Sequence, residues 1–320
     1  MLQTPAPSDI VDTEHLSRLT TTAPREYVHR AALAEVFLTA EWSRTDEAHF
    51  TLSAQWPRTH AFFAPLGRTH YDPMMAAETI RQVGALLAHA GFGVPLGHQF
   101  LMWELNYRVV PGALSVGETP ADLRLDVYCS DIRRRGGRLT GLAYEVVISE
   151  NGRTLATGDA RYTCTSPEVY RRLRADRLDA PPTASAPPTA PVEPRTVGRV
   201  DDFDVVLTPA GRPDRWRLRV DTRHPVLFDH PGDHIPGMVL LEAARQAVHS
   251  LAPEGQVVMP TAMDSTFHRY AEFGSPCVIG TEPAVNYPGS SERLVRVIGR
   301  QDGELLFTAI TAVTALPTRN

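Results

Sequence analysis

The sequence predicts an α+β protein made of two similar units, each with one long helix laid across an antiparallel sheet. A repeated motif, an apolar helix in each copy of it, and several strand-like segments after each helix support this prediction. When the 320-residue sequence is shifted by 164 positions, six identical residues align without a gap. The aligned pairs are His60 with His224, His70 with His234, Met74 with Met238, Glu78 with Glu242, Arg81 with Arg245, and Gln82 with Gln246. Identities of polar or rare types in one fixed register indicate a duplicated unit.

The second copy of the motif is the stretch from Asp229 to Gln246, DHPGDHIPGMVLLEAARQ. A loop rich in His, Asp and Gly leads to Pro and Gly, which are typical of a helix start, and then to an apolar run. Glu242 and Arg245 are the charged residues of this run. A helix with the pattern of a buried one seldom carries a carboxylate, so Glu242 needs a specific reason.

In the first half, the segment 28–39 fits both a strand after a turn and a short helix. Residues 47–56 alternate polar and apolar side chains with the period of a half-buried strand. Asp72 and Pro73 are a suitable cap and first-turn pair for a helix from about residue 74 to residue 90.

Four strand-like segments rich in Leu, Val, Tyr and Thr follow this helix, with turns such as RRRGG and ENG between them. They cover residues 99–110, 121–130, 138–150 and 153–164. The second half repeats the order, with a helix that ends near Ala252 and six expected strands. These strands lie near 201–207, 215–222, 256–263, 276–285, 293–299 and 304–313.

A stretch rich in Pro, Ala and Thr separates the two halves and is expected to be an extended, poorly packed linker. The expected division is a loose N-terminal arm at 1–24, a first domain at 25–178, the linker at 179–195 and a second domain at 196–316. A chain of 320 residues is long enough for two domains that each bury a core.

Composition excludes several classes of function. A net charge of −5 gives no basic field for nucleic acid, and the absence of lysine excludes Schiff-base chemistry. The three cysteines are isolated, which suits a reducing compartment. The N-terminus lacks the pattern of a signal peptide, and no apolar run reaches the roughly 18 to 20 residues of a membrane helix. We therefore expect a cytoplasmic protein without a membrane partner.

The 229–246 stretch resembles the His-containing loop and Pro-Gly helix of hotdog-fold β-hydroxyacyl-carrier-protein dehydratases. The whole chain resembles a narrower group, the A-factor biosynthesis hotdog family of γ-butyrolactone synthases. The blocks that carry this resemblance lie in both halves. They are REYVHRAALAEVFLT, AQWPRTHAFF, YDPMMAAETIRQVGALLAHAGFGVPLGHQFLMWELNY and RVDTRHPVLFDHPGDHIPGMVLLEAARQA.

This resemblance implies a tandem double hotdog, in which each long helix is wrapped by its own antiparallel sheet and the two units pack as an intramolecular pseudo-dimer. It also implies an acyltransferase that moves a β-ketoacyl group from acyl carrier protein to the hydroxyl of dihydroxyacetone phosphate, in the biosynthesis of signals that control secondary metabolism. The expected partners are therefore β-ketoacyl-acyl carrier protein and dihydroxyacetone phosphate, without a cofactor. The family's functional residues correspond to Glu78, Glu242 and Arg245.

The residues themselves offer one group for each step of such a transfer, which needs a base, oxyanion donors and a cation for the phosphate. Burial of Glu242 in an apolar helix is expected to raise its pKa toward that of a base. The helix N-terminus at Gly237 and Met238 offers N–H groups to the thioester oxygen. Arg245, three residues after Glu242, is placed to grip the phosphate. Pro73, which aligns with Gly237, has no N–H group, so the second loop is expected to supply the oxyanion site.

Other interpretations of these residues stay open. Glu242 with Arg245, and Glu78 with Arg81, fit intrahelical ion pairs that only neutralise each other. His230 and His234 fit a general acid or a substrate orienter, and also a residue that caps the helix. The spacing of the loop His and Asp residues matches no standard zinc pattern, so no metal is expected.

The alternative functions are a hotdog dehydratase or thioesterase acting on acyl-carrier-protein or acyl-CoA thioesters, and a non-catalytic ligand sensor. A dehydratase or thioesterase would use the same glutamate without needing Arg245 for a phosphate. The sequence leaves open the acyl chain, the final lactone, butenolide or furan product, the number of active clefts, and whether the chain forms a homo-oligomer.

Overall fold

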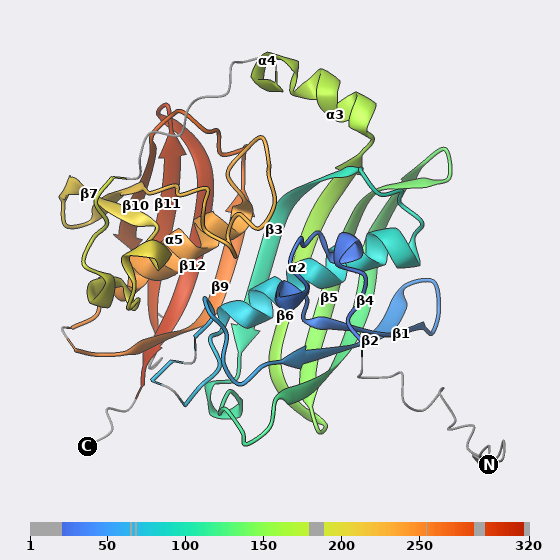
Figure 1. Cartoon of the computed structure of the whole chain (residues 1–320), viewed down its shortest axis with the longest axis horizontal. Helices are drawn as coiled ribbons and strands as arrows, with labels where there is room; N and C mark the ends of the chain where they lie inside the picture. The colour runs from blue at the N-terminus through green and yellow to red at the C-terminus, as the bar shows by residue number, and fades with distance from the viewer. Residues whose placement is uncertain are drawn as a thin grey trace, which may run out of the picture.

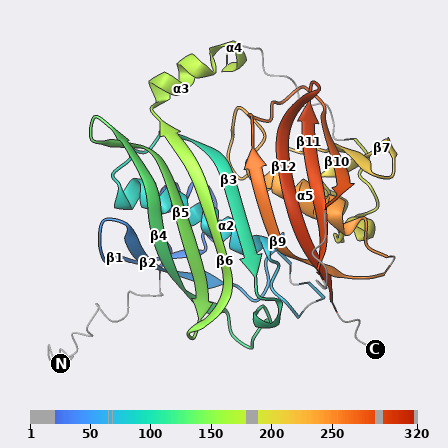
Figure 2. The same ribbon diagram turned by 180° about the vertical axis from the view of Figure 1, so that it is seen from behind.

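The computed structural model describes residues 21–64, 66–67, 69–178, 189–253, 255–284 and 292–316. Within these ranges, twelve strands form one antiparallel sheet, and two long helices lie on one of its faces (Figure 1 and Figure 2). The long helices are α2 (Met74–Leu86) and α5 (Gly237–His249). The first six strands are β1 (Leu38–Arg44), β2 (His49–Trp56), β3 (Gln99–Val109), β4 (Ala121–Arg135), β5 (Arg138–Glu150) and β6 (Arg153–Thr165). The other six are β7 (Leu207–Arg212), β8 (Arg215–Leu218), β9 (Val258–Phe267), β10 (Cys277–Pro283), β11 (Arg293–Gln301) and β12 (Glu304–Ala315).

The strand order is the same in both halves. The sheet runs β1-β2-β4-β5-β6-β3 and then β9-β12-β11-β10-β8-β7. Each half therefore places its strands in the order first, second, fourth, fifth, sixth and third, and the two third strands, β3 and β9, pair at the centre. The duplication predicted from the aligned residues thus extends to the topology.

Both long helices are buried on almost all sides by their half of the sheet. Arg81 is the one residue of α2 that is not buried, and α5 leaves only its two terminal residues partly exposed. Among the strands, α2 contacts β6 and β3 most, and α5 contacts β9 to β12. An apolar helix that is wrapped in this way can carry a carboxylate only with several partners.

Most of the expected elements are found, with local differences. Residues 28–39 contain both alternatives, because a 3₁₀ turn at Leu33–Glu35 precedes β1. Helix α2 continues into a π-helical turn at Leu87–Gly91, while α5 ends at His249, short of the expected Ala252.

The expected strand at 201–207 is wrong. The Asp201 side chain accepts a hydrogen bond from the Phe203 N–H and closes a 3₁₀ turn at Asp202–Asp204, so the strand begins only at Leu207. Two short helices, α3 (Pro167–Leu173) and α4 (Ala175–Leu178), were not predicted. The Ser166 side chain caps α3.

The expected linker at 179–195 lies outside the described residues up to position 188. Its last residues contact the second half, since Val192 N–H donates to Leu207 O and Arg219 Nε donates to Thr189 O. The expected arm likewise lies outside them up to position 20, and Thr21 O accepts a hydrogen bond from Ala40 N–H.

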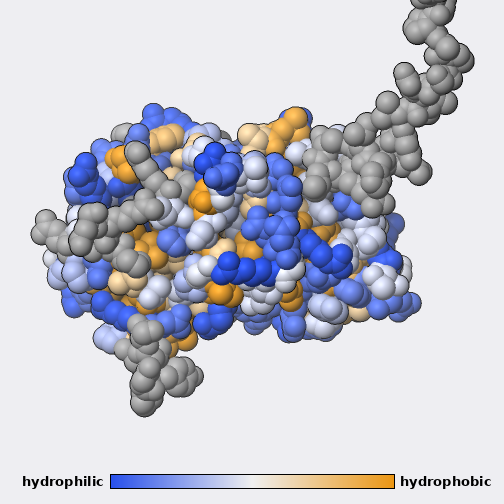
Figure 3. All heavy atoms as spheres, turned by 90° about the horizontal axis from the view of Figure 1, so that it is seen from below, coloured by the Kyte–Doolittle hydropathy of each residue, from blue (hydrophilic) through white to orange (hydrophobic). Residues whose placement is uncertain are grey.

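None of the described helices combines the length and apolarity that a bilayer-spanning helix requires. The face seen from below in Figure 3 mixes hydrophilic residues with small apolar patches.

Gly158 of β6 tests how closely α2 is held against the sheet. A Cβ at this position would overlap the Asn106 backbone oxygen on β3 and the Ile80 side chain on α2. We expect Gly158→Ala to lower the free energy of unfolding by about 1–3 kcal/mol in denaturant titrations. Gly280→Ala is the matched control in β10, where the nearest atom to the new Cβ is 3.9 Å away. Equal stabilities of the two variants would contradict the close packing at Gly158.

Candidate active site

Glu78 sits at the centre of a buried network in the first half. Its side chain is 0 % exposed and accepts hydrogen bonds from Arg30 Nε (2.9 Å), Arg81 Nη2 (2.7 Å) and Gln82 Nε2 (2.7 Å). Arg81 and Gln82 follow on the same helix, whereas Arg30 comes from the turn before β1.

Glu242 has the same set of partners in the second half. Arg199 Nε (3.0 Å), Arg245 Nη2 (2.7 Å) and Gln246 Nε2 (2.5 Å) donate to its fully buried carboxylate. Arg199 lies just after a 3₁₀ turn that precedes β7, as Arg30 follows the turn before β1. The two networks therefore share their composition and their geometry.

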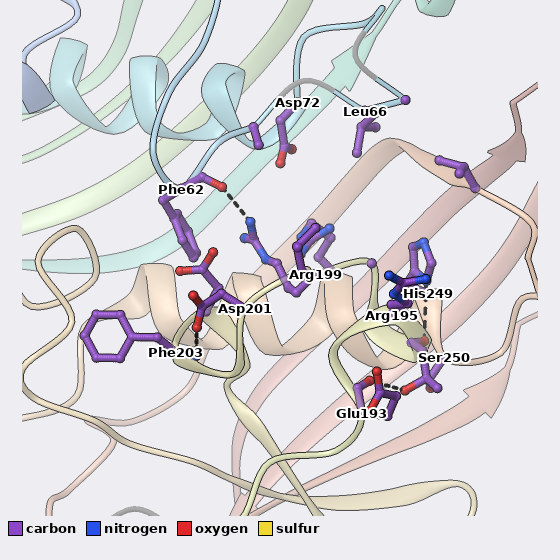
Figure 4. Close-up of a pocket in the computed structure, with 18 of the residues that line it drawn as sticks. Phe62, Leu66, Asp72, Glu193, Arg195, Arg199, Asp201, Phe203, His249 and Ser250 are labelled. Carbon is purple, nitrogen blue, oxygen red and sulfur yellow. Dashed lines mark hydrogen bonds between the residues drawn. The ribbon is translucent and has the colours of Figure 1, made fainter.

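The arginines that follow the two turns, Arg30 and Arg199, also donate hydrogen bonds to the opposite half. Arg30 Nη1 donates to Val226 O (2.8 Å), and Arg199 Nη1 donates to Phe62 O (2.5 Å; Figure 4). Phe62 and Val226 occupy aligned positions in the repeat. Each carboxylate is thus linked through one arginine to the opposite half.

The raised pKa expected for Glu242 is wrong. Burial alone would raise the pKa, but Arg199 and Arg245 outweigh it and lower the pKa of Glu242 to about 2. The pKa of Glu78 is lowered to about 2 in the same way, because Arg30 and Arg81 outweigh its burial. Both groups are ionised and surrounded by donors, which does not suit a general base.

Two clefts lie between the halves, and each joins the helix of one half to the loop of the other. The α2 cleft, of about 630 Å³, lies between α2 and the loop 228–237 of the second half. The α5 cleft, of about 1330 Å³, lies between α5 and the loop 59–72 of the first half. Figure 4 shows the α5 cleft with Asp72 entering from the first half and Arg199 from the second.

The residues predicted as one site are divided between these clefts. The α2 cleft is lined by Arg81, His230, His234, Gly237 and Met238. Arg245, the expected phosphate ligand, instead lines the α5 cleft and is 3 % exposed. Gly237 and Arg245 lie about two turns apart on one helix, so the sequence predicts one site for both. Gly237 instead lines the cleft beside α2, whereas Arg245 lines the cleft beside the first-half loop 59–72.

The two helix N-termini differ in a way that distinguishes the clefts. In α2, Asp72 Oδ1 accepts the Met74 N–H (2.9 Å), so the chain's own carboxylate occupies this end. In α5, no side chain caps the N-terminus after Pro236, and no hydrogen bond from Gly237 N–H is found among the described residues. The α2 cleft therefore contains the helix end that is free to bind an oxygen atom.

Two of the aligned histidines have a structural role. His60 Nδ1 accepts the N–H groups of Phe62 and Phe63, and His224 Nδ1 accepts those of Val226 and Leu227. Both rings hold the tight turn after them. His224, which lies just before the dehydratase-like loop, is thus engaged in the fold.

The other two loop histidines each pair with the preceding aspartate. His230 Nδ1 lies 2.6 Å from Asp229 Oδ1, and its side chain is 53 % exposed. His234 Nδ1 lies 2.7 Å from Asp233 Oδ1.

The unpredicted helix α3 holds this loop in place. Tyr170 Oη donates to Asp233 (2.7 Å), and Arg174 Nε donates to the same carboxylate (3.0 Å). Hydrogen bonds from these donors and from His234 outweigh burial and lower the pKa of Asp233. The end of the first half thus fixes the conformation of the second-half loop.

The rest of the α2 cleft is largely apolar, with side chains from β3, α5 and β9. These are Phe100, Met102, Leu105, Leu241 and Phe267. A flexible acyl chain suits such a wall. No group of three or more His, Cys, Asp or Glu side chains converges as a metal site in the part of the chain that the structure describes.

Sequence reasoning missed Arg30 and Arg199, which complete the two networks. They lie 169 positions apart, so the gap-free alignment at 164 positions cannot pair them. A five-residue gap aligns REYVHR with PRTVGR and would have revealed both arginines.

Comparisons with known proteins agree with this architecture. The family model of the A-factor biosynthesis hotdog domain matches residues 11–166 and 181–317. A protein of Streptomyces virginiae named 2-oxo-3-(phosphooxy)propyl 3-oxoalkanoate synthase is 54% identical over 292 residues, which cover 91% of this chain and 97% of the relative. A protein of the same name from Streptomyces coelicolor is 43% identical over 298 residues, covering 92% of this chain and 93% of the relative.

A solved structure with low sequence identity is similar to this chain in fold alone. A Lactobacillus plantarum protein described as a putative oleoyl thioesterase superposes with a TM-score of 0.50 at 11% identity. The superposition covers 84% of this chain and 97% of the thioesterase chain. The family match extends over both halves of the repeat, including both buried glutamates. The chain therefore belongs to the A-factor biosynthesis hotdog family.

Proposed function

We propose that this protein is an acyltransferase that condenses a β-ketoacyl-acyl carrier protein thioester with dihydroxyacetone phosphate or a similar glycerol-type phosphate. The product would be the phosphorylated ester that leads to γ-butyrolactone-type signals. The names of the relatives describe an ester of this kind, joining a 3-oxoalkanoate to a 2-oxo-3-(phosphooxy)propyl group. The observation that carries the proposal is the α2 cleft, where a free helix N-terminus, a partly exposed arginine and an apolar wall meet.

Each part of the α2 cleft suits one part of the two substrates. The thioester oxygen would accept the N–H groups of Gly237 and Met238 at the positive end of α5. The acyl chain would lie along the apolar wall. The phosphate would contact Arg81, whose side chain is 19% exposed, together with His230 at the edge of the cleft.

Glu78 would act through Arg81 and Arg30 rather than on the substrate. Its carboxylate orients both guanidinium groups and is inaccessible, so we assign it a positioning role. Glu242 would hold Arg245 and Arg199 in the same way in the second half. His234 would hold the loop through Asp233.

In this proposal the architecture is a tandem double hotdog that packs as an intramolecular pseudo-dimer. Its domains are 25–178 and 196–316, preceded by the arm at 1–24 and joined by the linker at 179–195. The mirrored strand order and the crossing arginines support this division.

Asp72 occupies the helix N-terminus in the α5 cleft, where a substrate oxygen would otherwise bind, so only the α2 cleft would be active. The three free cysteines are consistent with a cytoplasmic enzyme.

The transfer itself is tested with purified protein, β-ketoacyl-acyl carrier protein and dihydroxyacetone phosphate. We expect mass spectrometry to detect the phosphorylated β-ketoacyl ester and one free carrier-protein thiol for each ester. Free acid without ester would indicate a thioesterase and contradict the proposal. A β-ketoacyl chain has no β-hydroxyl to lose, so dehydration is tested separately with β-hydroxyacyl-acyl carrier protein. An enoyl product there, with no ester in the first assay, would indicate a dehydratase and contradict the proposal as well.

Arg81 and Arg245 form a matched pair of variants because they align in the repeat but face different clefts. We expect Arg81→Gln to raise KM for dihydroxyacetone phosphate by roughly 10-fold or more, since a charged hydrogen bond contributes about 1.5–3 kcal/mol. KM for the acyl donor should stay unchanged. Arg245→Gln should lower the melting temperature without a selective effect on the phosphate substrate. Steady-state kinetics showing the selective effect in Arg245→Gln would instead place the phosphate in the α5 cleft.

Gly237 tests the oxyanion site. Gly237→Pro removes the N–H group at a helix position that tolerates proline, and Gly237→Ala adds a Cβ while keeping the N–H. We expect kcat of Gly237→Pro to fall about 100-fold below that of Gly237→Ala, the usual cost of one lost oxyanion donor. Similar kcat values for the two variants would exclude this N–H group as a donor.

A further inference from the structure

We propose that His29 is the general base of the reaction and accepts the proton of the acceptor hydroxyl at its Nδ1 atom in the α2 cleft. This inference rests on the acyl transfer proposed above and assigns the base that the buried glutamates cannot supply. His29 lies outside the motif that the two halves share without a gap.

His29 has an unusual backbone conformation. His29 has φ 53°, in the left-handed region, where it ends the 3₁₀ turn Arg25–Val28. The equivalent turn of the second half, Pro194–Val197, ends in Gly198 with φ 70°. A residue with a Cβ is strained in this conformation, whereas glycine adopts it freely. The first half therefore carries an imidazole ring where the backbone favours glycine.

A hydrogen-bonded chain fixes the tautomer of this ring. His89 Nδ1 lies 2.7 Å from Val94 O, a carbonyl that can only accept, so His89 carries its proton on Nδ1. Burial lowers the pKa of His89, which keeps its Nε2 atom unprotonated. His29 Nε2 lies 2.8 Å from that atom and must be the donor. The lone pair of His29 is therefore on Nδ1.

The Nδ1 atom of His29 is available for a substrate. No hydrogen bond to it occurs among the residues that the structure describes, and His29 is part of the α2 cleft lining. Burial is the main cause that lowers the pKa of His29 to about 3, and Arg81, His89 and His230 add to it, so the ring is neutral and its Nδ1 lone pair is available at physiological pH. A ring with so low a pKa is a weak base in the free protein, so the proposal requires a phosphate bound by Arg81 to raise that pKa during the reaction.

Asp229 ties the turn that carries His29 to the loop that carries the other substrate groups. Its Oδ2 atom accepts the Ala31 N–H (2.9 Å), and its Oδ1 atom holds His230 (2.6 Å). The ring of His29 also packs edge-on against Phe100 of the apolar wall, with ring centroids 4.7 Å apart. The proposed base is thus fixed relative to both the loop and the acyl-chain wall.

His29 and the N-terminus of α5 supply the groups that the proposed transfer needs. The acceptor O–H bond breaks and its proton moves to His29 Nδ1 while the oxygen attacks the thioester carbonyl. The tetrahedral intermediate, with its oxyanion at the N-terminus of α5, then collapses and breaks the C–S bond. The leaving thiolate takes the proton from His29 Nδ1, which gives the ester and the free carrier-protein thiol and restores the neutral ring.

The test uses the full chain and the variant His29→Gly, which matches Gly198 and relieves the backbone strain. We expect kcat for ester formation to fall about 100-fold or more, with an unchanged or higher melting temperature and KM values close to those of the wild type. Added imidazole should restore part of kcat in His29→Gly and leave the wild type unaffected, a response that a structural role would not produce.

The kinetics of His29→Gly separate a failure of the His29 assignment from a failure of the proposed function. A kcat within a few-fold of the wild type, a loss that imidazole does not restore, or an effect on KM alone would overturn the assignment of His29 while leaving the acyl transfer intact. Absence of ester from the wild-type reaction would overturn the proposed function and this inference together.

Discussion

The structure depends on placing one carboxylate inside each long helix without leaving its charge unpaired. An isolated buried carboxylate would cost several kcal/mol, and here two arginines and a glutamine surround each one. Gln82 and Gln246 extend the networks to the backbone before the first strand of each half, at Glu35 and Phe37 and at Asp204 and Val206. The charges therefore set how the entering turn, the helix and the opposite half meet.

The repeat also shows how two equivalent clefts become different. Asp72 in the first copy aligns with Pro236 in the second, and this difference decides whether the helix end holds an internal carboxylate or stays open. Arg81 and Arg245 differ in exposure in the same sense. His29 and Gly198 add a third difference, on the side of the entering turn. All three place in the α2 cleft the groups to which the proposed mechanism assigns a role.

Much of the fold could be predicted from local pattern. The alternation in 47–56, the cap at Asp72, and the strands after α2 are near-neighbour signals, and they agree with the observed elements to within a few residues. The strand expected at 201–207 failed because a single aspartate side chain closes a turn there. The site was harder to predict, since Arg199 reaches Glu242 from 43 positions away and reverses the expected pKa direction. No periodicity shows that Gly237 lines the α2 cleft while Arg245 lines the α5 cleft.

The crossing of loops between the halves has a consequence for how such chains could be recombined. Because each cleft takes its helix from one half and its loop from the other, neither half lines either cleft alone. A chimera of two relatives joined between the halves would be a hybrid in both clefts at once. Substrate preference in this architecture would therefore be inherited from matched pairs of halves, and exchanging a single half would change the site without transferring it.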